Sequence, residues 1–415
     1  MTEQTPTRAS ADAPLRSLRY ANALSLTGGE GYEITLLLLA SAAYGRLLDV
    51  GWLGLVFTLP AIVSGPLVGA WLDRAGTARG SAMRVSDVVR AVLATGMALW
   101  LSAVPAGAVP VYVGAALITV FDVVFSTALR AGLPGLLRGD ETGGQRLRRA
   151  NAMLTSQTTL AQIVAPPLFV FALQYLSPVV VILLNAVTYL ASYVLLRRYA
   201  AAVDATADTR PAQERYLPLL REGLSIVRRD DVAPAILVAY ALTAGIGFAL
   251  LLSVPQLVVD RGLPTLTVGL SFSVLAGGAL IGARLARRPF AEGRSVPIVI
   301  GDPLVRAVVV VVLAVTANTV TVVAGFLVIG VCAGLANVSR LTMIQLRFDD
   351  AAQGRAMSLY LVANQILTPV TPMLWAAVAA AYGISTAYYA VAGVFAAAVV
   401  VLLAAPGVRR EAMRR

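Results

Sequence analysis

The chain alternates long apolar runs with short polar segments rich in arginine. A membrane-crossing helix needs about 20 mostly apolar residues, and twelve runs meet that length. The predicted spans are 18–44, 50–72, 82–103, 109–134, 150–173, 178–200, 233–256, 265–286, 296–316, 320–345, 356–380 and 384–405. What remains between them is too short for a water-soluble domain, so the pattern predicts an all-α membrane protein.

The spans group into two sets of six around one long polar stretch. The predicted parts are an N-terminal tail 1–17, a six-helix bundle 18–200, a linker 201–232, a second six-helix bundle 233–405 and a C-terminal tail 406–415. Within the linker, residues 201–215 are polar and predict a flexible tether. Residues 216–231 alternate leucines with charges, which is typical of a short helix lying on a membrane surface.

Composition supports the membrane class and sets an orientation. The chain is 58% hydrophobic and 13% charged, whereas soluble domains carry about 25% charged residues. The net charge of +11 would suit a nucleic-acid partner, but all the basic residues are arginines concentrated in alternate loops and both tails. Cytoplasmic loops carry such an excess. We therefore expect cytoplasmic termini, no nucleic acid and, from the arginine-, alanine- and valine-rich usage, a bacterial cytoplasmic membrane.

Few residues could support chemistry other than proton handling. The chain has no histidine, and Cys332 is its single cysteine, so an intrachain disulfide is impossible. The sequence contains no phosphate-binding Walker loop, metal-ligand cluster or nucleophile–base pair. We expect no cofactor and no enzymatic activity.

The two halves of the chain look like copies of one ancestor. Three sets of residues recur at a nearly constant offset. They are Gly65 and Gly69 with Gly278 and Gly282, Asp87 and Arg90 with Asp302 and Arg306, and Arg130 with Arg340. Such internal repeats are common in secondary transporters, whose substrate site lies where the repeats meet.

The loop after the second predicted span carries a family signature. It reads Gly69-Ala-Trp-Leu-Asp73-Arg74-Ala-Gly76-Thr-Ala-Arg79 and resembles the inner-loop motif G-x-x-x-D-R-x-G-R-R/K of the major facilitator superfamily. With the spans and the repeat, the resemblance extends over nearly the whole chain. It implies a major facilitator fold: twelve transmembrane helices in two pseudo-symmetric six-helix bundles.

Weaker patterns resemble one branch of that superfamily, the macrolide-efflux and enterobactin-exporter branch of drug–proton antiporters. They are 81–90, Arg149-Ala-Asn151 and 354–360. The span 150–173 departs from the antiporter signature G-x-x-x-G-P-x-x-G-G, because it has Pro166 and Pro167 but none of the glycines. The resemblance therefore leaves antiport and symport both open.

Five carboxylates fall inside predicted spans: Glu30, Glu33, Asp87, Asp122 and Asp302. Each costs roughly 2.5–3.5 kcal/mol at mid-bilayer, so such residues usually have a function or a partner. Glu30 and Glu33 share a helix face, and two close carboxylates in a low dielectric tend to share one proton. Glu30 would instead lie in the wet interface if its span began near residue 32.

Asp122 lies mid-way along its span, among apolar neighbours. In the superfamily the first and fourth helices line the central path, so the resemblance implies that Asp122 joins Glu30 and Glu33 in a site for protons and substrate. Arg130 lies about 12 Å further along the same helix, too far to pair with Asp122. A partner on another helix remains open.

The remaining intramembrane charges form spaced pairs. Asp87 with Arg90, and Asp302 with Arg306, are three and four residues apart and can neutralise each other on one helix, with Arg340 as a further buried charge. We favour a structural role for these pairs over a transport role.

The resemblance also implies a conformational latch. In the family, the motif aspartate, here Asp73, is thought to pair with an arginine of the fourth helix, here Arg130, beside the motif's Arg74, and with the end of the eleventh helix. The alternative is that these charges only set membrane orientation.

Together the patterns predict a proton-coupled exporter of an amphipathic organic compound. The expected partners are a small-molecule substrate, protons and membrane lipid, and the expected state is a monomer. The alternatives are a proton-coupled importer of a small metabolite and, more remotely, a membrane scaffold or lipid-modifying enzyme. Five polar residues either line the path or join helices: Gln157, Gln162, Asn185, Asn364 and Gln365.

Overall fold

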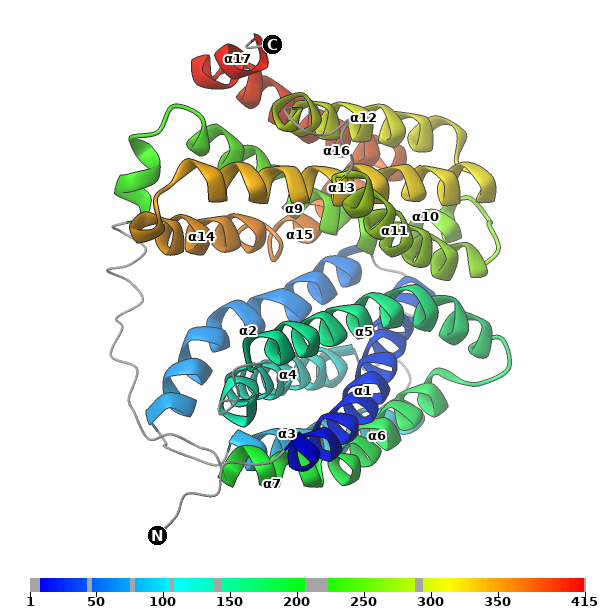
Figure 1. Ribbon diagram of the computed structural model, residues 1–415. Coiled ribbons are helices and arrows are strands. Elements are labelled where there is room, and N and C mark those ends of the chain that lie inside the picture. The colour runs from blue at the N-terminus through cyan, green and yellow to red at the C-terminus, as the bar shows by residue number, and fades with distance from the viewer. Residues whose placement is uncertain are drawn as a thin grey trace. The chain divides into compact units, whose positions relative to one another are not determined.

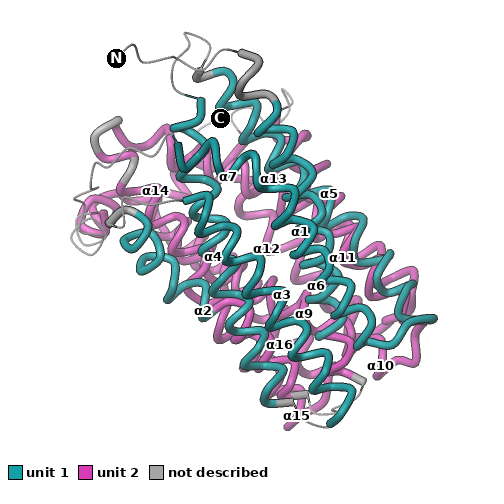
Figure 2. The backbone as a smooth tube through the Cα atoms, turned by 90° about the horizontal axis from the view of Figure 1, so that it is seen from below, with its two compact units in different colours: residues 1–36, 59–214 teal, residues 37–58, 215–415 magenta. Residues whose placement is uncertain are grey.

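The computed structural model describes residues 8–42, 47–74, 79–104, 108–137, 143–205, 223–287 and 294–413. Throughout these ranges the regular structure is helical, as the apolar pattern predicts (Figure 1). The chain divides into two compact units, coloured separately in Figure 2: unit 1 comprises 1–36 and 59–214, and unit 2 comprises 37–58 and 215–415.

Unit 1 contains the helices from the first half of the chain. They are α1 (Arg8–Ala42), α2 (Leu47–Arg74), α3 (Arg79–Ala103), α4 (Ala108–Leu137), α5 (Gly143–Ala172), α6 (Pro178–Leu195) and α7 (Arg197–Ala205). The end of α1 and the start of α2 group with unit 2. There Gly51 and Gly54 of α2 pack closely against Met373 and Pro372.

Unit 2 contains the helices from the second half. They are α9 (Ala233–Leu252), α10 (Val254–Asp260), α11 (Leu266–Leu285), α12 (Ser295–Thr316), α13 (Thr319–Arg347), α14 (Asp350–Gln365), α15 (Thr371–Tyr382), α16 (Ile384–Ala404) and α17 (Pro406–Met413). Residues 223–228 before α9 are also helical.

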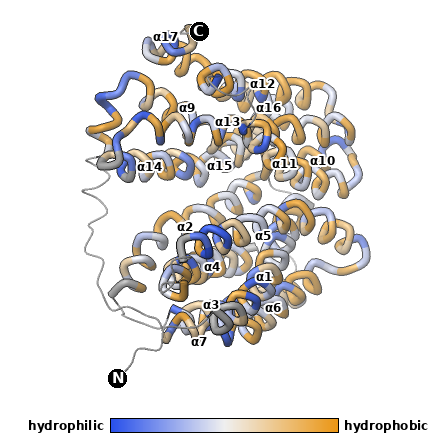
Figure 3. Tube along the Cα trace, in the orientation of Figure 1, coloured by the Kyte–Doolittle hydropathy of each residue, from blue (hydrophilic) through white to orange (hydrophobic). Residues whose placement is uncertain are grey.

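Nine helices among the described residues are long and apolar enough to cross a membrane, and Figure 3 shows how hydrophobic residues predominate along the helices of the chain. Each coincides with a predicted span. The predicted spans 18–44 and 150–173 fall in the long helices α1 and α5, which carry more polar residues. The predicted span 356–380 is divided between α14 and α15. The count of twelve therefore stays a prediction.

The interruption between α14 and α15 has a local cause. Pro369 and Pro372 lack the backbone N–H that a continuous helix requires. The turn is held by Thr371, whose hydroxyl donates to the Gly245 carbonyl of α9 at 2.6 Å. By contrast, Pro166 and Pro167 lie inside an unbroken α5.

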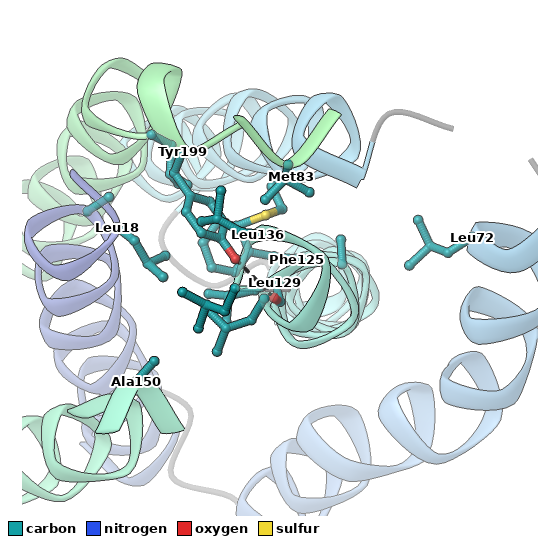
Figure 4. Packing of buried hydrophobic residues seen from close by; sticks show 14 of the residues in the cluster. Leu18, Leu72, Met83, Phe125, Leu129, Leu136, Ala150 and Tyr199 are labelled. Atoms are coloured by element: carbon teal, nitrogen blue, oxygen red, sulfur yellow. Dashed lines mark hydrogen bonds between the residues drawn. The ribbon is translucent and has the colours of Figure 1, made fainter. Parts of the chain in front are cut away.

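Unit 1 packs around one face of α4 (Figure 4). Leu129 and Leu133 of α4 are buried with Leu18 of α1, Met83 of α3 and Tyr199 of α7. The Tyr199 hydroxyl donates to the Leu129 carbonyl at 3.2 Å, which satisfies the only polar atom of a side chain in a low-dielectric interior. This contact fixes α7 against α4.

In unit 2, helices α11 and α13 pack backbone to backbone. Gly278 and Gly282 of α11 meet the backbone of α13, and Gly330 and Gly334 of α13 meet the backbone of α11. Glycines four residues apart allow such close approach of membrane helices. A methyl group added at Gly65 or Gly69, the repeat counterparts in α2, would meet no described atom within 4 Å. The two copies of the motif therefore pack differently.

Helix α7 extends to Ala205, into the stretch where the sequence predicts a tether. The extension caps another helix, because Asp204 accepts hydrogen bonds from the backbone N–H groups of Gly80 at 2.7 Å and Ser81 at 3.1 Å. These N–H groups belong to the first turn of α3, which has no helical partners for them. Residues 206–222 lie outside the described residues.

An ion-pair network joins the ends of three helices in unit 2. The Arg347 guanidinium at the end of α13 lies 2.7 Å from Asp230 and 2.6 Å from Glu411 of α17. Asp230 also accepts the Ala233 backbone N–H at 2.7 Å, which caps the start of α9. The network therefore ties α17 to the ends of α9 and α13.

Candidate functional site

Helix α1 holds both predicted glutamates in an unbroken helical segment. Glycines beside them let other helices approach. A side chain at Gly28 would collide with Asn185 and Thr188 of α6, and one at Gly31 would collide with the Phe169 ring of α5. The close packing on α5 and α6 fixes the depth and rotation of α1 within unit 1.

The two glutamates differ in environment. Glu30 is half-buried, and the side-chain amide of Gln162 on α5 lies within hydrogen-bonding reach of its carboxyl group. Glu33 is exposed and lies within electrostatic range of both Glu30 and Asp122 of α4. Carboxylates from α1 and α4 thus share one neighbourhood in unit 1.

Arg90 of α3 is the cation of this neighbourhood. It is 2% exposed and pairs with two carboxylates, Asp87 on its own helix and Asp122 on α4. The guanidinium carbon lies 4.4 Å from the Tyr189 ring centroid and 4.6 Å from that of Phe125, so aromatic faces from α6 and α4 cover the charge. The partner of Asp122 that the sequence left open is Arg90.

The two aspartates bound to Arg90 have opposite accessibility. Asp87 is 0% exposed, and its second oxygen accepts the Ser192 hydroxyl of α6 at 2.8 Å. The Asp122 side chain is 45% exposed. Asp87 is therefore a fully satisfied internal counter-ion, while Asp122 can exchange protons or meet a ligand. Ser192 and Tyr189 were not predicted, although their spacing of three residues puts them on one face of α6.

Unit 1 therefore contains an acidic cluster, which we define as Glu30, Glu33, Asp87, Asp122 and Arg90. Two of its four carboxylates, Asp87 and Asp122, pair with the guanidinium. Three of the four, all except Asp87, are at least partly accessible. An excess of negative charge in a membrane interior requires protons or a cationic ligand for balance.

Unit 2 contains the repeat counterpart with the charges reversed. Asp302 of α12 lies 2.7 Å from Arg306 of the same helix and 3.0 Å from Arg340 of α13. Arg306 Nε and Asp302 Oδ1 form an ion pair, but the N–H of Arg306 is not aligned for a hydrogen bond to that oxygen. Here two guanidiniums surround one carboxylate, and all three residues are buried.

The other predicted polar residues divide between the two roles left open. Gln157 joins α5 to α1, since it accepts from Asn22 at 3.0 Å and donates to the Arg19 carbonyl at 2.7 Å. Gln162, five residues along, reaches Glu30 instead. Gln157 therefore joins two helices, whereas Gln162 lies beside the glutamates of the candidate site.

Of the three residues predicted to form a latch, only Arg130 has a described side chain. The side chains of Asp73 and Arg74 lie outside the described residues. Arg130 is exposed near the end of α4. Within the part of the chain that the structure describes, no group of three histidine, cysteine, aspartate or glutamate residues is arranged to hold a metal ion.

Comparisons with known proteins agree with this architecture. Residues 21–304 match the model of the Major Facilitator Superfamily. A relative, the uncharacterized MFS-type transporter y4rN of Sinorhizobium fredii, is 25% identical over 366 residues, which cover 86% of each chain.

Solved structures share the fold. The peptide transporter POT in complex with sulfate superposes with a TM-score of 0.69 at 13% identity, covering 96% of this chain and 95% of that one. A mutant of the nucleoside transporter NupG also gives a TM-score of 0.69 at 13% identity, covering 95% of this chain and 100% of that one. With a family match over more than half of its length, the chain belongs to the Major Facilitator Superfamily and is a multi-pass secondary transporter rather than an enzyme.

Proposed function

We propose that this transporter exports an amphipathic, cationic or neutral organic compound in exchange for protons. It would do so by alternating access across a bacterial cytoplasmic membrane, with both termini in the cytoplasm. One observation carries the proposal: Glu33 lies within electrostatic range of Glu30 and Asp122, and Asp122 pairs with the buried guanidinium of Arg90. The efflux branch that the sequence resembles is part of the same proposal.

The charge balance of the cluster favours competition between protons and a cation. With all groups ionised, Arg90 compensates one of four carboxylates, and the remaining negative charge is costly inside a membrane. Each proton taken up by Glu30 or Glu33 lowers that cost, and so does a bound cationic group. Because the same carboxylates would serve both, loading of one ligand expels the other, as exchange requires.

Arg90 keeps a carboxylate partner whether Asp122 is ionised or protonated. When Asp122 is ionised, Arg90 pairs with Asp122 and Asp87 together. When Asp122 is protonated, the guanidinium keeps Asp87, which is held in place by Ser192. The buried cation therefore has a partner in either state, and Asp122 can change its protonation without leaving the guanidinium unpaired.

The energy available is adequate for accumulation against a gradient. Each elementary charge that crosses a potential of 100 mV contributes about 2.3 kcal/mol. For a neutral substrate, one or two protons per cycle would then support a concentration ratio of roughly 50 to 2,500, since about 1.4 kcal/mol corresponds to a factor of ten. A monovalent cation carries one charge outward, so its exchange gains from the potential only when two or more protons enter per cycle.

Transport into inside-out vesicles tests the proposal. With a proton gradient imposed, ethidium, an amphipathic cation, should accumulate with the wild-type protein, and a protonophore should abolish accumulation. Glu30→Gln should lose gradient-driven accumulation, because the amide cannot carry the proton. Asp260→Asn is a matched control, since Asp260 is a half-exposed carboxylate in unit 2 outside the cluster.

Two outcomes would overturn the proposal. Full gradient-driven accumulation by Glu30→Gln would remove the glutamate from coupling. Proton-driven accumulation only in right-side-out vesicles would identify an importer instead.

A further inference from the structure

A second polar group in unit 2 plays no part in the acidic cluster. It consists of Tyr240 on α9, Asn337 on α13 and Tyr360 on α14. The Asn337 side-chain oxygen Oδ1 accepts the Tyr240 hydroxyl at 3.1 Å and the Tyr360 hydroxyl at 2.6 Å. The two rings stack with centroids 4.6 Å apart, so three helices hold one asparagine side chain in a fixed position.

The orientation of the Asn337 amide follows from Arg340, one turn further along α13. The Arg340 guanidinium lies 4.6 Å from the Tyr240 ring centroid and within hydrogen-bonding reach of the Tyr360 hydroxyl. A guanidinium can only donate, so the hydroxyl accepts from it and passes its own hydrogen to the next acceptor. The Tyr240 hydroxyl also lies within hydrogen-bonding reach of the Tyr360 hydroxyl, and the Asn337 backbone carbonyl lies at 3.4 Å. Asn337 Oδ1, at 2.6 Å, is the nearer of the two Asn337 oxygens, and it also accepts the Tyr240 hydroxyl.

The amide nitrogen Nδ2 is consequently directed away from this network with both hydrogens available. Asn337 is exposed, whereas Tyr240, Tyr360 and Arg340 are buried. Unused donors on an apolar membrane helix are costly unless they face water or a ligand. The hydrogen bonds behind the amide polarise it, since chains of bonds strengthen one another.

The charge behind the amide has a definite sign. Arg306 and Arg340 share the single carboxylate of Asp302. These three side chains together therefore carry one excess positive charge. A fixed donor backed by positive charge suits an anionic oxygen ligand.

We propose that Asn337 Nδ2 is a binding subsite for an anionic oxygen group, a carboxylate or a phosphate, on a bound molecule. Tyr240 and Tyr360 position the amide, and Arg340 supplies the field through Tyr360. The assignment goes beyond the proposed function and does not depend on proton coupling, because it concerns equilibrium binding to unit 2.

Binding to the purified full-length protein in detergent, without a proton gradient, tests the proposal. The probes are 4-phenylbutyrate, 4-phenylbutyl phosphate and 4-phenylbutylamine, which share an apolar body and differ in the head group. Titration calorimetry should show that wild type binds at least one anionic probe, and the two anionic arms identify which group is preferred.

Asn337→Asp is the decisive variant, because it keeps the acceptor for both tyrosines and replaces the donor by a negative charge. Its melting temperature should not fall. Its affinity for the anionic probe should drop roughly ten- to hundredfold, since a hydrogen bond to a charged group is lost. Binding of the amine should not weaken. Tyr360→Phe, which breaks the connection to Arg340, should weaken the anionic probe less.

Asn151→Ala is the matched control, because it removes an exposed asparagine from a helix of unit 1 and should leave all three affinities unchanged. The proposal is overturned if wild type binds neither anionic probe. It is also overturned if Asn337→Asp binds the preferred anionic probe as tightly as wild type does.

Discussion

Replacing Arg90 with methionine should destabilise unit 1 by about 3–5 kcal/mol, the usual effect of removing one partner from a buried ion pair. The reason lies in Asp87, which is 0% exposed. Without Arg90 this carboxylate keeps only the Ser192 hydroxyl at 2.8 Å. Methionine retains contact with the rings of Tyr189 and Phe125, so the loss reports mainly on the uncompensated charge.

A second variant separates the charge from the packing. Asp87→Leu combined with Arg90→Met replaces the pair by apolar groups, a change that is often neutral or stabilising. It should recover most of the stability lost in the single variant. Asp122→Asn should cost less than about 1 kcal/mol, because the partly exposed Asp122 side chain is solvated.

Unfolding in mixed micelles of detergent and dodecyl sulfate gives the free energies. Arg90→Met, Asp87→Leu and the double variant form a cycle that isolates the pair. A cost below about 1 kcal/mol for Arg90→Met would contradict the reasoning. So would a double variant no more stable than the single one, since the lost charge compensation would then not be the cause.

Three further predictions concern other parts of the chain. Gly28→Ala should lower the melting temperature, because its new carbon meets Asn185 and Thr188, whereas Gly29→Ala, with nothing within 4 Å, should raise it slightly through the better helix propensity of alanine; equal shifts would contradict the close packing of α1. Burial alone would raise the pKa of Asp230, but the Ala233 N–H and the Arg347 guanidinium stabilise its charged form and lower the pKa overall. The stability it contributes is therefore complete above the unfolded pKa of about 3.9 and is lost as pH falls through the lower folded value, so thermal melts of Asp230→Asn should depend less on pH in that range than those of wild type. Asp73→Asn should slow turnover of ethidium transport with little change in its half-saturating concentration, and unchanged turnover would remove the proposed latch.

Hydropathy predicted helices well because a membrane helix satisfies its own backbone, so a local apolar run is sufficient information. Hydropathy was less informative where polar side chains interrupt an apolar run. Helix α1 carries Glu30 and Glu33 inside its apolar part and several arginines in its first half, and together these residues lower its mean hydropathy. The break between α14 and α15 depends on Thr371 finding the Gly245 carbonyl on another helix, which no local pattern encodes.

The candidate site shows the same division. Spacing alone predicts that Asp87 can reach Arg90, because both lie on one helix three residues apart. That Arg90 also reaches Asp122 depends on the relative depth of α3 and α4, which packing sets and sequence distance does not. The Asn337 group was missed for a similar reason: tyrosines and an asparagine are common in membrane helices, and only their convergence from three helices gives them a shared role.

The glycines where α11 meets α13 have a consequence for reading variation in this protein. A side chain added to any of Gly278, Gly282, Gly330 and Gly334 would enter the opposing backbone, so a saturation scan scored by expression would reveal two rows of intolerant positions at intervals of four residues. Those rows would arise from steric exclusion alone, with no substrate or proton involved. Invariance there would record a mechanical constraint on folding, and a search for functional residues guided by invariance would be drawn to the wrong pair of helices.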